Sequence, residues 1–212
     1  PYDFNLFHLS DEEKKKLKGL PTSLEAALDG KAEVIMQDGK GDQATQNDQL
    51  DVMIEKGVDV LAVNMVDAKA AAGVVEKAKE ADGFVFGSPV HFASASGALT
   101  SFMDRAFYGK GAVFANKPAA AIMSCRRGGA TATLDQLNKY FTISNMPVVS
   151  GTYWNQVHGN TPDEVKQDLE GMQPMRTLGV NMAWLLKCIE AGKAAGIELP
   201  QREAKVATNF IR

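Results

Sequence analysis

The sequence predicts an α/β domain: a doubly wound parallel sheet of about five strands in a three-layer α/β/α sandwich. Short apolar runs alternate with amphipathic helical patterns along most of the chain, as they do in stacked βα units. Several of these runs are apolar on both faces, which is typical of strands buried between two helix layers. The 212 residues are enough for one large domain of this kind.

The candidate strands begin after Lys31, and each is a short apolar run. Helical patterns separate them, so a right-handed crossover is expected between successive parallel strands. In chain order the runs are residues 32–37, 58–66, 82–88, 117–125 and 146–154.

The helices expected between the strands carry apolar residues three or four positions apart. The last is the longest, over residues 175–193, with Gly192 as its expected stop. The apolar faces are Leu50, Met53 and Ile54; Ala71, Val74, Val75 and Ala78; Leu99, Phe102, Met103 and Ala106; and Leu178, Met182, Leu185, Leu186 and Ile189.

Residues 1–28 form an N-terminal arm whose place in the fold stays open. Residues 2–9 alternate like a strand, and Ser10 with Glu13 makes a capping box for a short charged helix that Pro21 ends. The arm is either an added edge strand and helix or a segment that packs on a partner.

Composition and charge exclude several classes of function. The net charge is −3 with Lys and Arg scattered, so no nucleic-acid partner is expected. No apolar run approaches the roughly 20 residues of a membrane span, so no membrane is expected either. The two cysteines, Cys125 and Cys188, are too few for a disulfide framework or a four-cysteine metal site. We therefore expect a cytoplasmic protein without a metal.

Residues from about 76 to 212 resemble the flavodoxin-like family of NAD(P)H-dependent FMN reductases. The resemblance is carried by EKAKEADGFVFGSPVHFASASGALTSFMDRAFY, by KPAAAIMSCRRGGATATLDQLNKYF and by NMPVVSGTYWNQVHG. It implies a flavodoxin-like fold, FMN as cofactor, NAD(P)H as electron donor, a small-molecule electron acceptor and a homodimer.

Residues 29–79 resemble a different family, the N-terminal lobe of bacterial periplasmic galactose/glucose-binding proteins. The resemblance is carried by QNDQLDVMIEKGVDVLAVNMVD. Both parent folds are doubly wound, so a βαβα piece of one can replace the corresponding piece of the other. Together the two resemblances predict one flavodoxin-like domain over residues 1–212. This domain is a chimera in which the segment at 29–79, similar to a periplasmic binding protein, joins the reductase segment at 80–212.

The cofactor is expected beyond the carboxyl ends of the strands, where doubly wound sheets bind their ligands. Gly87 begins a turn after a central strand and permits the close approach of a flat ring. Each contact has a structural alternative. The segment at Gly87 simply turns the chain, His91 is satisfied by local hydrogen bonds, and Phe92 is a packing residue. The expected contacts are Ser88, Pro89, Val90, His91 and Phe92.

Two later segments supply further expected contacts. The arginines after the fourth strand can hold a phosphate or the negative charge of a reduced flavin, or they form a solvated basic turn. Tyr153 and Trp154 cover a ring face, or they belong to the core or an interface; His158 reaches a substrate or a partner subunit. Cys125 is expected to be a small buried residue rather than a nucleophile. The resemblance assigns Ser124, Cys125, Arg126, Arg127, Gly128 and Gly129 to the flavin.

The FMN phosphate is expected at the turn after the first strand. Lys40 offers charge, Gly41 allows a tight turn, and Thr45 caps the next helix, whose N-terminus favours an anion. Three aspartates in the same turn oppose an anion, and most such turns bind nothing. Iron–sulfur members of the family carry a cysteine cluster before the central strand, and its absence here predicts no iron–sulfur centre.

Three functions stay open at this point. The first is an FMN-binding oxidoreductase that transfers electrons from NAD(P)H to a small acceptor; the flavin carries that chemistry, so no catalytic side chain is assigned. The second is a folded scaffold that binds no flavin because its phosphate loop is foreign. The third, a galactose/glucose-binding module, is disfavoured because only part of one lobe of such a clamp is present.

Overall fold

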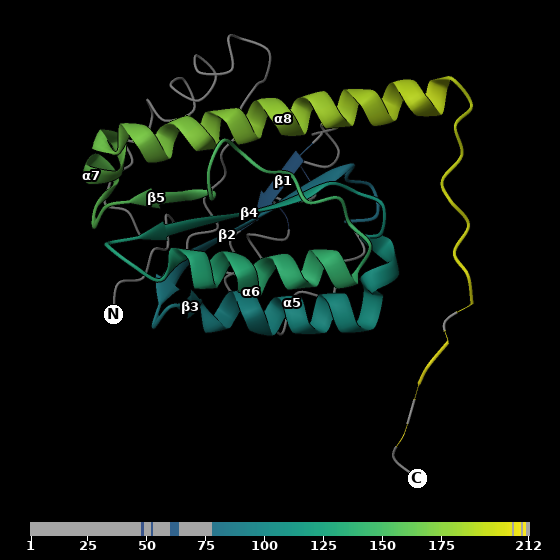
Figure 1. Ribbon diagram of the computed structural model, residues 1–212, viewed down its shortest axis with the longest axis horizontal. Coiled ribbons are helices and arrows are strands. Elements are labelled where there is room, and N and C mark those ends of the chain that lie inside the picture. The colour runs from purple at the N-terminus through teal and green to yellow at the C-terminus, as the bar shows by residue number, and fades with distance from the viewer. Residues whose placement is uncertain are drawn as a thin grey trace.

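The computed structural model describes residues 78–204, together with residues 48, 52, 60–63, 206–208 and 210. In this part of the chain a parallel sheet lies between two layers of helices (Figure 1). The long helix α8 (Leu169–Ala194) covers one face, and α5 (Gly97–Lys110) and α6 (Ala130–Ile143) cover the other. The predicted flavodoxin-like α/β/α sandwich is confirmed.

The parallel strands follow the order β1-β2-β4-β5 in the sheet. Their bounds are Val60–Val63 for β1, Gly83–His91 for β2, Ala119–Cys125 for β4 and Gln156–His158 for β5. A short strand β3 (Ser94–Ala95) pairs antiparallel with the end of β2. The other strand pairs among the described residues are parallel, as the crossover pattern of the sequence predicts.

Strand β2 extends further than the sequence predicts. The expected turn at Gly87 is wrong, because the pairing with β4 continues until Pro89 lies opposite Ser124. The strand β1 pairs with β2 only as far as Phe86. The described part of β1 ends at that point, whereas Pro89, which has no N–H to donate, still pairs with Ser124 on the β4 side.

A tight hairpin joins β2 to β3. Phe92 and Ala93 have φ angles of 51° and 57°, both positive, as a two-residue hairpin of type I′ requires. The hydroxyl of Ser88 donates to the carbonyl of Pro89 at 2.7 Å and accepts from the N–H of Ser96 at 2.8 Å. The hairpin is thereby fixed to the start of α5.

The last strand lies later in the chain than predicted. Residues 146–154 are irregular apart from one parallel bridge between Val148 and β4, so the strand expected there is wrong. Pro147 and Gly151 interrupt that apolar run. In contrast, β5 contains a single apolar residue, Val157, and therefore shows no apolar pattern.

The face under α5 and α6 is an aromatic core. The rings of Phe107 and Phe114 stack with centroids 4.5 Å apart, and Phe86 lies 5.3 Å from Phe141. A short 3₁₀ helix, η2 (Gly111–Val113), follows α5. The predicted apolar face of α5 is confirmed, since Leu99, Phe102, Met103 and Ala106 are all buried.

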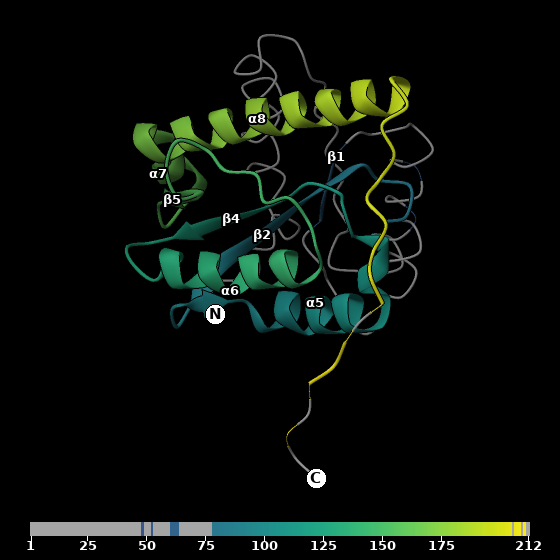
Figure 2. The ribbon, with the colours of Figure 1, turned by 45° about the vertical axis from the view of Figure 1, so that its right-hand side comes forward.

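The face under α8 is a smaller aliphatic core in which Leu178 and Met182 are buried. The helix passes its expected stop at Gly192 and ends two residues later. Gly196, with φ at 80°, then closes the helix, and the N–H groups of Gly196 and Ile197 bind carbonyls of the last turn at 3.0 and 2.9 Å. The C-terminal segment leaves α8 at the end remote from the β3 hairpin (Figure 2).

Several predictions fall outside the described residues. They are the arm at 1–28, the strand at 32–37, the helix faces at Leu50–Ile54 and Ala71–Val75, and the phosphate candidates Lys40, Gly41 and Thr45. None of the helices in the described part of the chain is long and apolar enough to cross a membrane.

Candidate cofactor site

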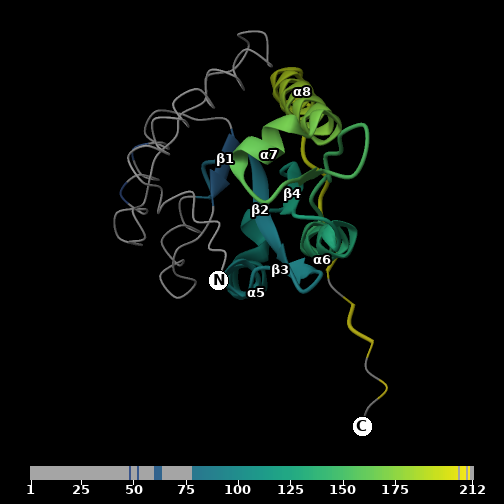
Figure 3. The same ribbon diagram turned by 90° about the vertical axis from the view of Figure 1, so that its left-hand side faces the viewer.

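The carboxyl ends of β2, β4 and β5 meet at one edge of the sheet, which faces the viewer in Figure 3. Pro89 pairs with Ser124, and Cys125 pairs with His158, so the segments that follow these strands start side by side. This is the edge at which doubly wound sheets bind their ligands. It brings together the segments at 88–92 and 124–129 that the sequence assigns to a cofactor.

The loop after β4 packs directly on the β2–β3 hairpin. Gly129 has a φ of 92°, in the left-handed region, and a Cβ at this position would lie 2.8 Å from the Cα of Ala93 and 3.0 Å from Val90. A larger residue cannot keep both this backbone conformation and this contact. Glycine is therefore required for the loop to lie against the hairpin.

The expected contacts differ in their exposure. Ser88 is buried, and its hydroxyl already has two partners inside the fold. Pro89 and Val90 are half-buried. The groups open to solvent at the edge are His91, Phe92, Arg126, Arg127 and Gly128.

Cys125 is buried at 5% exposure, as predicted. Burial raises the pKa of its thiol, and hydrogen bonds from the backbone of Arg127 and Ala130 oppose this only in part. The thiol is therefore protonated near neutral pH, and Cys125 is a small packing residue rather than a nucleophile.

Ser124, one residue before the end of β4, has a buried hydroxyl oxygen without a hydrogen-bond partner among the described residues. A buried hydroxyl that stays unpaired destabilises a fold by about 1–3 kcal/mol. Such an oxygen is explained if a bound molecule or water completes its hydrogen bonds. Ser124 pairs with Pro89 near the carboxyl edge, so its hydroxyl is a candidate for such a contact.

Tyr153 and Trp154 lie at the amino end of β5, not after its carboxyl end. Their rings are half-exposed and 4.6 Å apart between centroids. The loop that carries them is held by Asn155, whose side chain donates to Ala121 and accepts from the N–H of Gly151, both at 3.1 Å. These aromatic residues therefore precede their strand, whereas the other candidates lie at or after the carboxyl ends of theirs.

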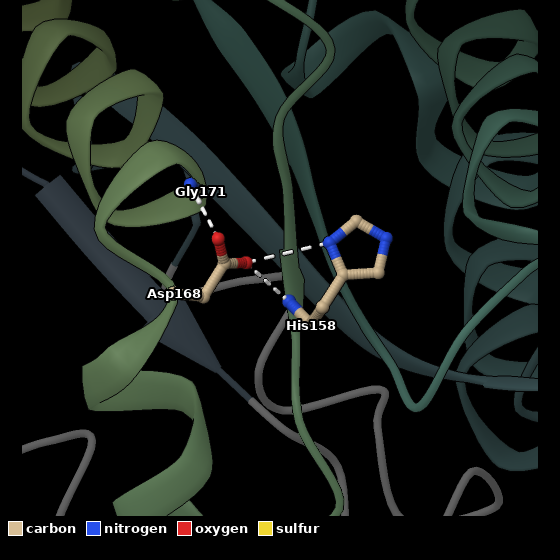
Figure 4. Close-up of polar contacts among 3 residues, drawn as sticks. All are labelled: His158, Asp168 and Gly171. Carbon is tan, nitrogen blue, oxygen red and sulfur yellow. Dashed lines mark hydrogen bonds and ion pairs between the residues drawn. The ribbon is translucent and has the colours of Figure 1, made fainter.

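A polar cluster that the sequence did not suggest lies at the carboxyl end of β5 (Figure 4). Asp168, between α7 (Pro162–Gln167) and α8, accepts from the N–H of His158 at 2.7 Å and from the N–H of Gly171 at 2.9 Å. The Nδ1 of His158 also faces Asp168, at 3.4 Å. Ten residues separate the pair in sequence, so only the fold brings them together.

Asp168 is ionised at neutral pH. Its partial burial raises its pKa, but the hydrogen bonds from Gly171 and His158 and the nearby imidazole outweigh that effect, and the net pKa is lowered. Gly171 is required here, because a Cβ would overlap the Asp168 carboxylate and lie 2.9 Å from the carbonyl of Gln156. In the described part of the chain no three His, Cys, Asp or Glu residues are grouped to hold a metal ion.

The fold defines a flavodoxin-like α/β protein with a candidate ligand edge at the carboxyl ends of its strands. The chain belongs to the NADPH-dependent FMN reductase family, whose model matches residues 23–161. The family supports FMN as the cofactor.

An iron-sulfur flavoprotein of Methanocaldococcus jannaschii is 34% identical over 125 residues, which is 55% of this chain. The chain covers 65% of that relative's length. The D-galactose/methyl-galactoside binding periplasmic protein of Haemophilus influenzae is 38% identical over 78 residues, or 37% of this chain and 21% of that protein.

Among solved structures, a flavodoxin, WrbA-like protein from Agrobacterium tumefaciens matches with a TM-score of 0.46 and 18% identity, over 53% of this chain and 71% of that one. At this level the likeness carries no argument about function. The family assignment therefore depends on the family model.

The described residues fit the ring end of FMN. The edge offers a half-buried hairpin backbone, two exposed arginines and the unpaired hydroxyl of Ser124, which together suit a flat ring with one polar side. Arginine is suited to the negative charge of a phosphate or of a reduced flavin. The candidates for the phosphate end lie outside the described residues.

Proposed function

We propose that this chain is an FMN-dependent oxidoreductase that transfers electrons from NAD(P)H to a small acceptor. The observation that carries the proposal is the pairing of Pro89 with Ser124, which sets the hairpin after β2 beside the loop after β4. Bound FMN would supply the redox chemistry, which is the uptake of a hydride from the nicotinamide and the transfer of its electrons to the acceptor. The protein's part is to bind and orient the reactants and to supply charge at the edge.

We infer that the ring of the cofactor lies between the hairpin and the loop. Arg126 and Arg127 place two exposed positive charges beside it, and Ser124 offers a hydroxyl that has no partner among the described residues. The buried hydroxyl of Ser88 fixes the hairpin instead of reaching outward. The proposed contacts are Pro89, Val90, His91, Phe92, Ser124, Arg126, Arg127, Gly128 and Gly129, with Lys40, Gly41 and Thr45 at the phosphate.

We also infer that residues 1–212 form one domain. The family model runs from residue 23 to residue 161 across the joint expected near residue 79, which supports a continuous reductase domain. The match to the galactose-binding protein supports a chimeric origin, but it covers only 21% of that protein. A sugar-binding protein of this kind needs residues from both of its lobes, and the matched segment supplies only part of one. The sugar-binding function is therefore not proposed.

A homodimer through α8 is proposed as well. Val180 and Trp184 lie one turn apart on that helix and are 54% and 67% exposed. Large apolar side chains that stand exposed together mark interaction surfaces. Light scattering on Trp184→Glu tests the interface, with Ile143→Glu as control, since Ile143 is an exposed apolar residue at the end of α6. We expect only the first variant to be monomeric.

An FMN titration followed by fluorescence quenching tests the proposed function. The wild type is expected to bind one FMN per chain, and anaerobic NADPH is expected to bleach the bound flavin. Replacing Arg126 and Arg127 by Gln should weaken binding at least tenfold, about 1.4 kcal/mol, whereas Arg105→Gln on the exposed side of α5 should not. A chain that binds no FMN would be a folded scaffold without flavin activity. Heat released on titration with galactose would support a galactose-binding module.

A further inference from the structure

We propose that His158 is the proton donor for the acceptor, with its ring held in place by Asp168. The inference depends on the proposed function and narrows the acceptor to molecules that take up protons when they are reduced, such as quinones. The geometry of the polar cluster at the end of β5 carries the argument.

His158 lies at the right edge of the sheet for this role. It is the last residue of β5 and pairs with Cys125, the residue directly before Arg126 and Arg127. The N–H of Gly159 donates to the carbonyl of Cys125 at 3.0 Å, which holds the two strand ends together. The side chain of His158 is 42% exposed, so a small molecule at this edge can reach it.

The ring is oriented by the carboxylate of Asp168. Nδ1 lies 3.4 Å from Oδ2, a long contact beside the 2.7 Å hydrogen bond from the backbone of the same residue. A carboxylate next to Nδ1 selects the tautomer that carries its proton there. Figure 4 shows the other ring nitrogen, Nε2, pointing away from Asp168. Nε2 is therefore left for exchange with a bound molecule.

Asp168 can hold the ring in this way because it is itself fixed. The N–H of Gly171 in the first turn of α8 and the N–H of His158 bind its two oxygens. A carboxylate fixed by backbone groups stays in place while the imidazole gains or loses a proton. Asp168 is thus a positioning residue, and Nε2 of His158 is the reacting atom.

The proton balance shows why such a donor is useful. Reduction of a quinone to a hydroquinone consumes two electrons and two protons. NAD(P)H supplies the electron pair and one proton, and leaves as NAD(P)+. The second proton passes from Nε2 of the protonated His158 to an oxygen of the acceptor, and the neutral ring then regains a proton from water. Ferricyanide takes up electrons without a proton and needs no such donor.

Magnetic resonance of the histidine rings provides a test that does not depend on activity. The chain has three histidines, so histidine-selective ¹⁵N labelling gives three ring pairs, and His158→Gln identifies the signals of His158 by their loss. In the neutral ring of His158 we expect the proton on Nδ1, and we expect Nε2 to shift when FMN is added. Asp168→Asn should alter that tautomer, whereas Glu170→Gln, an exposed carboxylate in the same turn of α8, should not. A proton on Nε2, or signals unmoved by FMN, would overturn the inference.

The reaction test compares two acceptors on the FMN-loaded protein. In His158→Gln the ratio of benzoquinone to ferricyanide turnover should fall about 100-fold, the lower range for a general acid. An unchanged ratio would refute the role of His158, even if both rates fell together. Failure of the wild type to bind FMN or to be reduced by NADPH is a different result, because it refutes the proposed function on which this inference depends.

Discussion

Gly129 and Ala93 lie in direct contact: a Cβ on Gly129 would lie 2.8 Å from the Cα of Ala93. The contact seats the loop after β4 on the hairpin after β2. It joins two segments that are 36 positions apart in the sequence (129 − 93) into one surface at the carboxyl edge of the sheet.

The first prediction concerns this contact. If Gly129→Ala keeps the left-handed backbone, it carries about 1–2 kcal/mol of strain and its methyl group meets Ala93. If it leaves that conformation, the loop moves off the hairpin. We expect FMN affinity to fall at least tenfold, as measured by fluorescence titration, while the circular dichroism of the fold is kept. Gly97→Ala is the control, because nothing lies within 4 Å of a Cβ there. Equal affinities for the two variants would show that the contact does not shape the binding surface.

The second prediction concerns the start of α8. In Gly171→Ala the new methyl group meets the Asp168 carboxylate and the carbonyl of Gln156, so the cap of the helix must shift. We expect the free energy of unfolding in urea to drop by about 1–3 kcal/mol. The same substitution at Gly192 meets only Ile197, at 3.7 Å, and should leave stability equal or raise it. A stable Gly171→Ala protein would contradict the described position of Asp168.

The third prediction concerns Tyr140, whose hydroxyl donates to Asp104 at 2.5 Å and links α6 to α5. Burial, followed by the hydrogen bond and charge of Asp104, raises the pKa of Tyr140 to about 12. The neutral phenol is thus favoured in the folded state, so its contribution is complete below the usual tyrosine pKa of about 10 and is lost as pH rises towards 12.

Urea unfolding between about pH 8 and pH 11 measures this contribution. We expect Tyr140→Phe to lower stability by about 1 kcal/mol or less at the lower pH, since the bond is partly exposed, and to remove part of the decline at the higher pH. Tyr108→Phe is the control, because that side chain is 97% exposed. Identical pH profiles for wild type and Tyr140→Phe would contradict the assignment.

The sequence predicts the central part of the fold because burial there leaves a clear pattern. Strand β4 consists almost entirely of small and apolar residues, and α5 repeats its apolar residues at helical spacing. Helix α6 carries a similar pattern, and its buried residues are Ala130, Thr133, Leu134, Leu137 and Phe141.

The edges of the sheet escaped prediction for physical reasons. Strand β5 is three residues long with one apolar side chain, so its partner β4 determines it rather than any pattern of its own. The hairpin turn consists of Phe92 and Ala93, not of the glycine or asparagine that such turns usually carry. Glycine and proline at Gly87 and Pro89 suggested a turn, but the pairing with β4 overrides it.

The candidate site was predicted in part. The segment from Arg126 to Gly129 lies where the sequence suggests, because a loop directly after a buried parallel strand must reach the carboxyl edge. Asp168 was missed because its partners are backbone N–H groups and a histidine in another element, and no local spacing reveals such contacts.

Hydrogen exchange with and without FMN tests the central claim most directly, because it locates the cofactor on the chain. We expect FMN to slow exchange in peptides that contain the hairpin at 91–94 and the loop at 126–129, and to leave the C-terminal end of α8 unchanged. If FMN instead protected the C-terminal end of α8, or bound without protecting either of the two segments, the carboxyl edge would not be the flavin site.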